Sequence, residues 1–76
     1  MSRIKNVIPK DHYCIEVLLE NGSSVILNLE SRIQTVRFNI LSDKELFNRA
    51  TTDGICIHWD NKVEISIGEV FQLVQR

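Results

Sequence analysis

Apolar residues alternate with polar residues along two stretches of the chain, with the period of two that is typical of half-buried β-strands. The first stretch covers residues 13–19 and 25–29, and the second covers residues 55–59 and 63–65. A short polar segment interrupts each stretch, Glu20-Asn21-Gly22 in the first and Asp60-Asn61-Lys62 in the second. The pattern therefore predicts two β-hairpins, each with one apolar face.

The length of each hairpin loop decides which residues share a face, because a shift of one residue moves every side chain to the other side of the sheet. A two-residue first loop would set Val17 opposite Ile26 and spread apolar residues over both faces. A three-residue loop sets Val17 opposite Val25 and, in the second hairpin, Trp59 opposite Val63. We therefore predict three-residue loops and the following core face: Tyr13, Ile15, Val17, Leu19, Val25, Leu27, Ile55, Ile57, Trp59, Val63 and Ile65.

Other signals place the remaining elements. A strand near residues 4–8 ends at Pro9, which has no amide to donate and belongs at a sheet edge or a strand end. Capping boxes of the form Ser-x-x-Glu begin at Ser42 and Ser66 and predict two helices, the first ending before residues 51–54 and the second running to the chain end. A helical turn is expected at residues 30–33. We predict a single α+β domain over residues 1–76, an antiparallel sheet of about five strands with two or three short helices packed on one face.

The charge balance argues against functions that need a strong electric field. The chain of 76 residues has 9 Lys and Arg against 10 Asp and Glu, a formal net charge of −1. Direct binding of nucleic acid or of an anionic membrane is therefore not expected. No apolar run approaches the roughly 20 residues of a membrane span, and the first residues lack the hydrophobic segment of a secretory signal. We expect a cytoplasmic protein in which Cys14 and Cys56 are free thiols.

No catalytic motif is recognisable in the sequence. Gly22, Gly54 and Gly68 are dispersed, so they do not form a glycine-rich phosphate loop. Each of the two histidines lies two positions from a cysteine along a strand, too far for routine hydrogen bonding between a nucleophile and its base. We therefore predict a protein that is not an enzyme and has no cofactor.

Four side chains of the zinc-ligand type form two pairs, His12 with Cys14 and Cys56 with His58. Each pair has the i, i+2 spacing that places both members on one side of a strand. If the two strands were neighbours, the four side chains would converge into a Cys₂His₂ tetrahedron. The spacing matches no known zinc module, and we favour the alternative in which both cysteines are small apolar residues on a mixed face.

The outward side of the predicted sheet is more apolar than a solvated face requires. Cys14, Leu18, Ile26 and Cys56 lie there among polar residues, and a contiguous apolar patch marks an interface. Pairing through an exposed strand edge is a second route to association. We therefore predict self-association or a small protein partner, with these four residues as interface candidates.

Several segments of the chain occur in an order that is distinctive as a set. They are Val7-Ile8-Pro9, residues 13–22 with Asn21-Gly22 in the turn, Leu41-Ser42-Asp43-Lys44-Glu45-Leu46-Phe47, and residues 57–65 around Trp59. This order resembles the small bacterial proteins of domain-of-unknown-function family 2442 over nearly the whole chain. The family commonly has Trp-Pro-Asn-Gly at the second turn, whereas Asp60 and Lys62 replace its proline and glycine here. Because a left-handed residue other than glycine costs about 1 kcal/mol, we expect another turn geometry.

The resemblance implies a stand-alone cytosolic module to which no enzymatic residue can be transferred. Relatives are often encoded beside another small protein, and some are fused to a helix-turn-helix domain. The favoured reading is thus a non-catalytic protein-interaction or regulatory module. The alternative hypothesis is an antitoxin-like or DNA-associated regulator that acts through a partner protein. A Cys/His zinc-binding module is the least favoured hypothesis.

Overall fold

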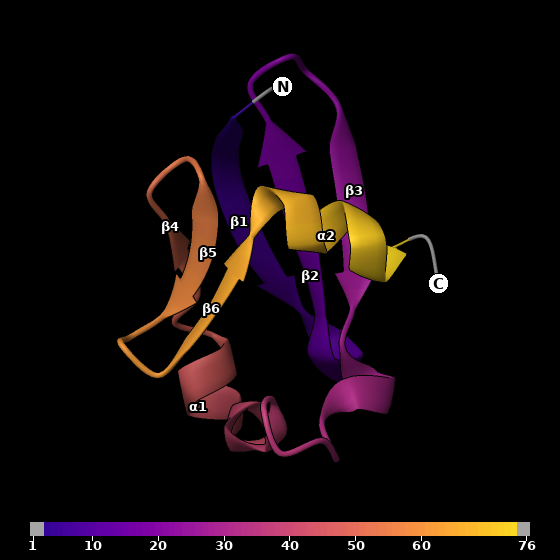
Figure 1. Ribbon diagram of the computed structural model, residues 1–76, viewed down its shortest axis with the longest axis vertical. Helices are drawn as coiled ribbons and strands as arrows, with labels where there is room; N and C mark the ends of the chain where they lie inside the picture. The colour runs from indigo at the N-terminus through magenta and orange to yellow at the C-terminus, as the bar shows by residue number, and fades with distance from the viewer. Residues whose placement is uncertain (1–2, 75–76) are drawn as a thin grey trace.

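The computed structural model describes residues 3–74 and contains two antiparallel three-stranded sheets and two α-helices (Figure 1). The first sheet has the order β1 (Ile4–Lys10), β2 (Cys14–Leu19) and β3 (Ser24–Asn28). The second has the order β4 (Thr51–Thr52), β5 (Cys56–Trp59) and β6 (Val63–Ser66). The helices are α1 (Lys44–Phe47) and α2 (Ile67–Val74), and the 3₁₀ turns are η1 (Asp11–Tyr13), η2 (Glu30–Arg32) and η3 (Asn39–Ser42).

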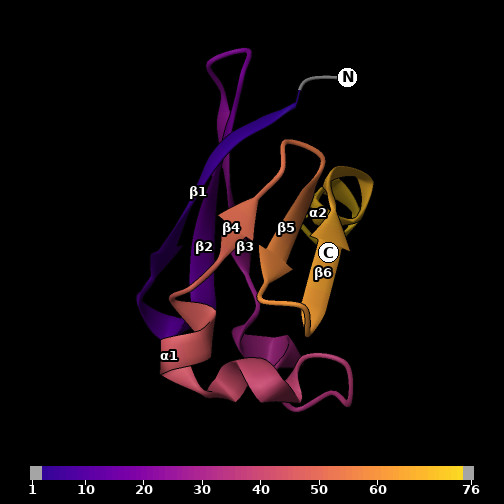
Figure 2. The ribbon, with the colours of Figure 1, turned by 90° about the vertical axis from the view of Figure 1, so that its left-hand side faces the viewer.

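The α+β class is confirmed, whereas the prediction of one sheet of about five strands is wrong. The sheets meet where β1 passes the turn after β4, and the amide of Ile4 donates to the carbonyl of Gly54 at 2.8 Å (Figure 2). Pairing does not extend along β1 for two reasons. The strand β4 has only two residues, and β1 has a register irregularity between Ile4 and Asn6 and then Pro9, which cannot donate to a ladder.

Both hairpins have the predicted register. Val17 faces Val25 in the first hairpin, and Trp59 faces Val63 in the second, each across a three-residue loop. Gly22 has a φ of 92°, as a three-residue loop with a left-handed glycine requires. The expected end of the first strand at Pro9 is wrong, because β1 continues to Lys10. Pro9 nevertheless lies at an edge of its sheet, in agreement with its missing amide.

The second turn differs in geometry from the first, in which the left-handed residue is Gly22 at the third loop position. Its left-handed residue is Asp60, with a φ of 52°, at the first loop position rather than at Lys62. Aspartate tolerates this conformation better than most residues with a side chain. The carboxylate of Asp60 also accepts a hydrogen bond from Nη2 of Arg49 at 3.1 Å, which ties the turn to the segment after α1.

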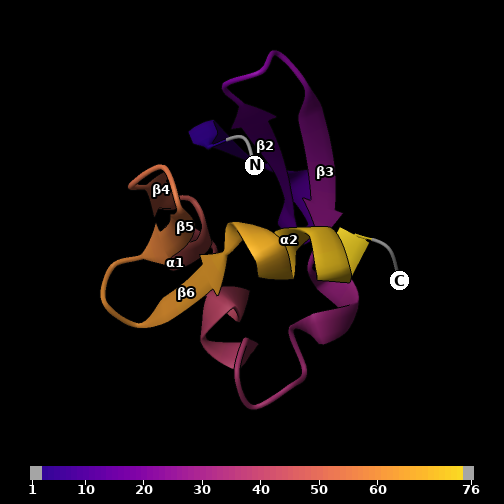
Figure 3. The same cartoon turned by 45° about the horizontal axis from the view of Figure 1, so that its top comes forward.

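The inner faces of the two sheets enclose one hydrophobic core. The helix α2 packs on β3 and β6 and covers the side on which these strands stand apart, and α1 and the 3₁₀ turns η2 and η3 lie below the sheets (Figures 1 and 3). The core residues are Ile4, Val7, Ile15, Val17, Leu19, Leu27, Leu29, Phe38, Leu41, Leu46, Phe47, Ile57, Trp59, Val63, Ile65 and Val70.

Three residues of the predicted core face differ from that expectation. Tyr13 and Val25 are partly buried and pack against the core, whereas Ile55 is 54% exposed. The amide of Ile55 is bonded to the carboxylate of Asp53 at 2.9 Å, so residue 55 belongs to the turn and β5 begins at Cys56. A side chain from the turn thus overrides the alternation of the strand.

The helix starts confirm one capping prediction and correct the other. Asp43, not Ser42, caps α1, because its Oδ1 accepts from the amide of Glu45 at 3.0 Å. Ser66 caps α2 as predicted, with Oγ accepting from the amide of Glu69 at 3.2 Å. The expected continuation of α2 to the chain end lies outside the described residues. Within residues 3–74, no helix is long and apolar enough to cross a membrane.

Aromatic side chains fix α1 to the sheets. The ring of Phe47 stacks on Trp59, with centroids 6.0 Å apart, and meets Tyr13 edge-on at 5.5 Å. The buried indole of Trp59 donates from Nε1 to the carbonyl of Phe47 at 3.0 Å. Tyr13, Phe47 and Trp59, which lie in the segments that resemble the family, therefore pack on one another at one end of the core.

Candidate functional site

The outward side chains of β1, β2 and β3 form a surface that we call the aliphatic face. They lie in three cross-strand rows, Asn6–Leu18–Ser24, Ile8–Glu16–Ile26 and Lys10–Cys14–Asn28. Ile26 is 53% exposed, and the side chains of Ile8, Leu18 and Cys14 are half-buried. Aliphatic residues of neighbouring strands thus surround one charged side chain, that of Glu16.

Three of the four predicted interface residues share this face, namely Cys14, Leu18 and Ile26. Cys56 does not, because it lies on β5 in the other sheet. Ile8, which was not among the predicted interface residues, lies beside Glu16 in the central row. Its outward orientation follows the register irregularity between Ile4 and Asn6, and alternation alone does not reveal where such an irregularity falls.

The charges of the aliphatic face compensate one another. Nζ of Lys10 lies 3.5 Å from Oε1 of Glu16, and the side chains are 51% and 25% exposed. These are the ionisable groups of the three rows, apart from the thiol of Cys14. The face therefore has no net charge with which to attract a strongly acidic or basic partner.

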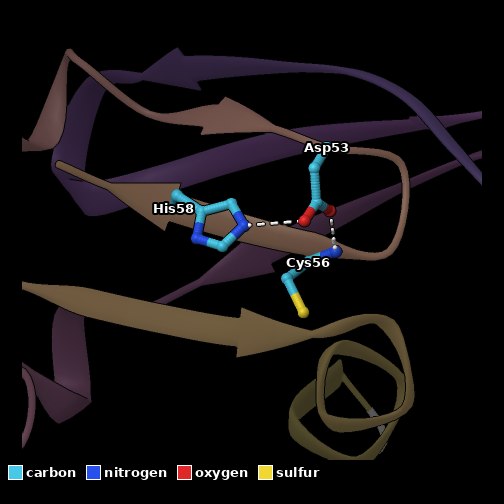
Figure 4. Close-up of side chains that lie close together, drawn as sticks. All are labelled: Asp53, Cys56 and His58. Carbon is cyan, nitrogen blue, oxygen red and sulfur yellow. Dashed lines mark hydrogen bonds and ion pairs between the residues drawn. The ribbon is translucent and has the colours of Figure 1, made fainter. Parts of the chain in front are cut away.

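A second group of polar side chains, which we call the donor cluster, lies on the outward side of the other sheet. Its members are Asp53, Cys56 and His58 (Figure 4). Cys56 and His58 point outward from β5 because the alternate residues Ile57 and Trp59 are fully buried. Asp53 is held in the preceding turn, where its Oδ1 accepts from the amides of Ile55 and Cys56, both at 2.9 Å.

The ligand atoms of the donor cluster lie close together. Oδ2 of Asp53 is 3.1 Å from Nε2 of His58, and one ligand atom from each of the three residues lies within 4.8 Å of the others (Figure 4). The second ring nitrogen of His58, Nδ1, is 3.9 Å from Oε2 of Glu64, its cross-strand neighbour on β6. The imidazole therefore stands between two carboxylates.

The surroundings shift two pKa values of the donor cluster in opposite directions. Hydrogen bonds from the amides of Cys56 and Ile55, and then from His58, hold the pKa of Asp53 well below its usual range. Burial, followed by the negative charges of Glu64 and Asp53, raises the pKa of the Cys56 thiol. At neutral pH the cluster thus combines an ionised carboxylate with a protonated thiol.

The structure does not assemble the four ligands considered in the sequence analysis. Strands β2 and β5 belong to different sheets, so the pair His12 and Cys14 is separated from the pair Cys56 and His58. His12 lies in η1, with Nδ1 at 3.9 Å from Oε2 of Glu30. The condition for a four-ligand site, that the two strands are neighbours, is therefore not met.

Within residues 3–74, the donor cluster is the group in which three possible metal-ligand side chains lie close together. In it, Asp53 accompanies Cys56 and His58 in place of His12 and Cys14. Sequence reasoning missed Asp53 because it was assigned only to a turn. The available signal was an Asp-Gly turn that lies one residue before a Cys-x-His strand.

An open cleft of about 560 Å³ lies between η1, Glu30 and α1. Its lining includes cationic Lys10 and Lys44 and anionic Asp11 and Glu30, and it contains no Ser, Thr or Cys among the described residues. Because the charges have both signs, the cleft does not select an anion or a cation. The described lining therefore does not pair His12 with a Ser, Thr or Cys nucleophile.

Comparison with known proteins gives one match. A family model described as "Protein of unknown function (DUF2442)" matches residues 4–73. Searches of curated proteins and of solved structures found no match.

Proposed function

The chain belongs to the DUF2442 family, and on that premise we propose that it is a non-catalytic interaction module that binds a second copy of itself through the aliphatic face. The observation that carries the proposal is the set of solvent-facing aliphatic side chains on three adjacent strands, Ile8, Leu18 and Ile26. Burying these side chains against another apolar surface is favourable, by about 25 cal/mol per Å².

The charge pattern of the face supports a second copy as the occupant. In a contact with two-fold symmetry, each side presents the same residues to the other. The face contains one cation, Lys10, and one anion, Glu16, so an identical copy presents opposite charges without net repulsion. A strongly charged partner would gain nothing from this arrangement.

The area of the aliphatic face sets the expected affinity of the dimer. Three strands of about five residues each cover roughly 14 Å by 17 Å, from the usual strand spacing and rise. This is well below the roughly 800 Å² per partner of a standard interface, and contacts at the small end of the range are weak and transient. We therefore expect a reversible dimer with a dissociation constant between micromolar and millimolar.

Sedimentation velocity over a series of protein concentrations tests the proposal. The wild-type chain should shift from monomer to dimer as concentration rises, whereas Leu18→Asp and Ile26→Asp should stay monomeric with unchanged circular dichroism. Ile55→Asp is the matched control, because Ile55 is 54% exposed and Ile26 is 53% exposed, but Ile55 lies outside the aliphatic face. This control should dimerise as the wild type does.

Two results would overturn the proposal. One is a wild-type chain that remains monomeric over the whole series, and the other is an Ile55→Asp variant that loses association as fully as Ile26→Asp. The alternative of a regulator acting through a partner predicts a monomer that co-purifies with a different protein in stoichiometric amount. Loss of that complex in Leu18→Asp would assign the aliphatic face to the partner instead of a second copy.

A further inference from the structure

The donor cluster combines three kinds of ligand atom on one exposed side of β5. Asp53 offers a carboxylate oxygen, His58 an imidazole nitrogen and Cys56 a sulfur, all within 4.8 Å of one another. Zinc uses these three ligand types in proteins. We propose that Asp53, Cys56 and His58 bind a zinc ion with water at the fourth position, and that Glu64 positions the His58 ring.

The distances are close to those of a tetrahedral site. Bond lengths of about 2.0–2.3 Å place the ligand atoms of tetrahedral zinc about 3.3–3.8 Å apart. The Asp53–His58 separation of 3.1 Å is already within this range to a few tenths of an ångström, and the widest separation must close by about 1 Å. Rotation of the half-buried Cys56 side chain supplies such a movement.

The backbone around the cluster is already organised for ligand binding. Oδ1 of Asp53 is occupied by the amides of Ile55 and Cys56, which fixes the carboxylate and directs Oδ2 toward His58. Cys56 and His58 lie on a strand whose intervening residue is buried in the core. Preorganisation of this kind reduces the entropy that a ligand must remove on binding.

Glu64 supplies the outer partner that a zinc-bound histidine usually has. A histidine that binds zinc through one ring nitrogen commonly donates the other N–H to a carboxylate, which fixes the ring orientation. Here Nε2 of His58 faces the cluster, and Nδ1 lies 3.9 Å from Oε2 of Glu64. Zinc would replace the Asp53–His58 hydrogen bond, and the Nδ1–H would be directed to Glu64.

Cys56 distinguishes a metal site from a simple Asp–His ion pair. Its sulfur takes no part in the Asp53–His58 hydrogen bond, and yet it lies within 4.8 Å of both partners' ligand atoms. Zinc binding displaces the proton of the Cys56 thiol to solvent. The resulting thiolate favours zinc over magnesium or calcium, which prefer oxygen ligands. The cluster therefore selects a borderline transition metal.

Cobalt titration of the reduced, metal-free chain tests the site, because Co²⁺ takes the place of Zn²⁺ and absorbs light. The expected result is saturation at one equivalent with a sulfur-to-cobalt charge-transfer band and the visible bands of four-coordinate cobalt. Zn²⁺ should displace the cobalt and remove both signals. A wild-type chain that shows no sulfur-to-cobalt band would overturn the proposal.

The chain provides a matched control for each soft ligand, because it has two cysteines and two histidines. Cys56→Ser should abolish the charge-transfer band, whereas Cys14→Ser should keep it at full intensity. His58→Gln should weaken cobalt binding at least about 10-fold, whereas His12→Gln should not change it. Equal losses in the two cysteine variants, or in the two histidine variants, would contradict the assignment.

Two further substitutions keep the test decisive if a ligand variant does not fold. Asp53→Asn retains an Oδ1 acceptor for the two amides and removes the anionic ligand, so it should bind cobalt weakly while keeping its circular dichroism. Glu64→Gln should keep the charge-transfer band and lower the affinity about 10-fold, as expected for a positioning residue. Unchanged cobalt affinity in Asp53→Asn would show that the turn carboxylate is not a ligand.

Discussion

The outward surfaces of the two sheets differ although the same alternation of residues produces them. On the first sheet, the outward positions collect Ile8, Leu18 and Ile26 around a single compensated ion pair. On the second, the outward positions of β5 are Cys56 and His58, and the preceding turn adds a carboxylate. The first surface is suited to contact with another apolar surface, and the second to coordination of an ion.

The core and the outer surfaces obey separate constraints. Both inner faces are aliphatic and aromatic, because each must bury its side chains against the other sheet. Neither the fold nor the core determines which residue types occupy the outward positions. The outward residues therefore carry the information about function in a domain of this size, and the following changes separate their contributions from that of the core.

Loss of the shared core should have the largest effect and remove both surfaces together. Trp59→Ala deletes a fully buried side chain that stacks on Phe47 and donates to its carbonyl. We expect a loss of about 3–5 kcal/mol in the free energy of unfolding, a large part of the stability of a small domain. Urea denaturation followed by circular dichroism measures it, and a loss below about 1 kcal/mol would contradict the packing described.

Zinc should stabilise the second sheet without requiring the first surface. At a free zinc concentration about 100 times the dissociation constant, binding adds about 2.7 kcal/mol, which raises the melting temperature by about 10 °C or more. The gain should be the same in wild type and Ile26→Asp and absent in Asp53→Asn. Differential scanning calorimetry with and without zinc measures it, and equal stabilisation of Asp53→Asn would contradict the site.

The ion pair between Arg37 and Glu69 should contribute about 1 kcal/mol to the free energy of unfolding, and only above acidic pH. Arg37 makes a two-point contact with the Glu69 carboxylate and donates to the carbonyl of Glu64 at 2.8 Å. The hydrogen bond from Arg37 lowers the pKa of Glu69, so this stabilisation is complete above the unfolded-state pKa and disappears as pH falls through the folded-state value.

The substitution Glu69→Gln tests whether this stabilisation is lost toward acidic pH. It should destabilise the chain at pH 7, and the difference from wild type should narrow as the pH falls below the ordinary pKa of glutamate and through the lower pKa of Glu69 in the folded chain. Urea unfolding at several pH values measures the difference. A difference that stays constant or grows toward acidic pH would show that the ion pair is not its source.

The ion pair on the aliphatic face should have the smallest effect on the folded monomer. Lys10 and Glu16 are 3.5 Å apart and partly exposed, so a double-mutant cycle with Lys10→Met and Glu16→Gln should give a coupling energy of about 0.5 kcal/mol. The same variants should change the salt dependence of dimerisation, measured by sedimentation. Coupling above about 2 kcal/mol in the monomer would show that the pair has a structural role instead.

Local signals in the sequence predicted the hairpins correctly. The period of two and the three-residue loops determine that Val17 faces Val25 and that Trp59 faces Val63, because these contacts are close in sequence. The errors arise where a side chain competes with the strand or helix pattern. Asp53 bonds the amide of Ile55 and takes that residue out of the core face, and Asp43 caps α1 in place of Ser42.

The alternation of apolar and polar residues did not predict the contacts between residues that are distant in the sequence. The two sheets meet where the Ile4 amide donates to the carbonyl of Gly54, and the register irregularity of β1 follows directly after Ile4. The candidate site shows the same limit. Cys56 and His58 were predicted to share a side of one strand, which is a local property. Of the other two residues considered, Cys14 lies on the other sheet and His12 lies in the turn η1 that precedes it.

Amide chemical-shift mapping by two-dimensional NMR tests the separation of the two surfaces most directly. Zinc added to a dilute sample should move the signals of residues 53–58 and Glu64, and a rise in protein concentration without zinc should move those of Ile8, Leu18, Ile26 and their neighbours. The two sets of shifted signals should not overlap. Zinc shifts centred on His12 and Cys14, or a single set that responds to both changes, would contradict this expectation.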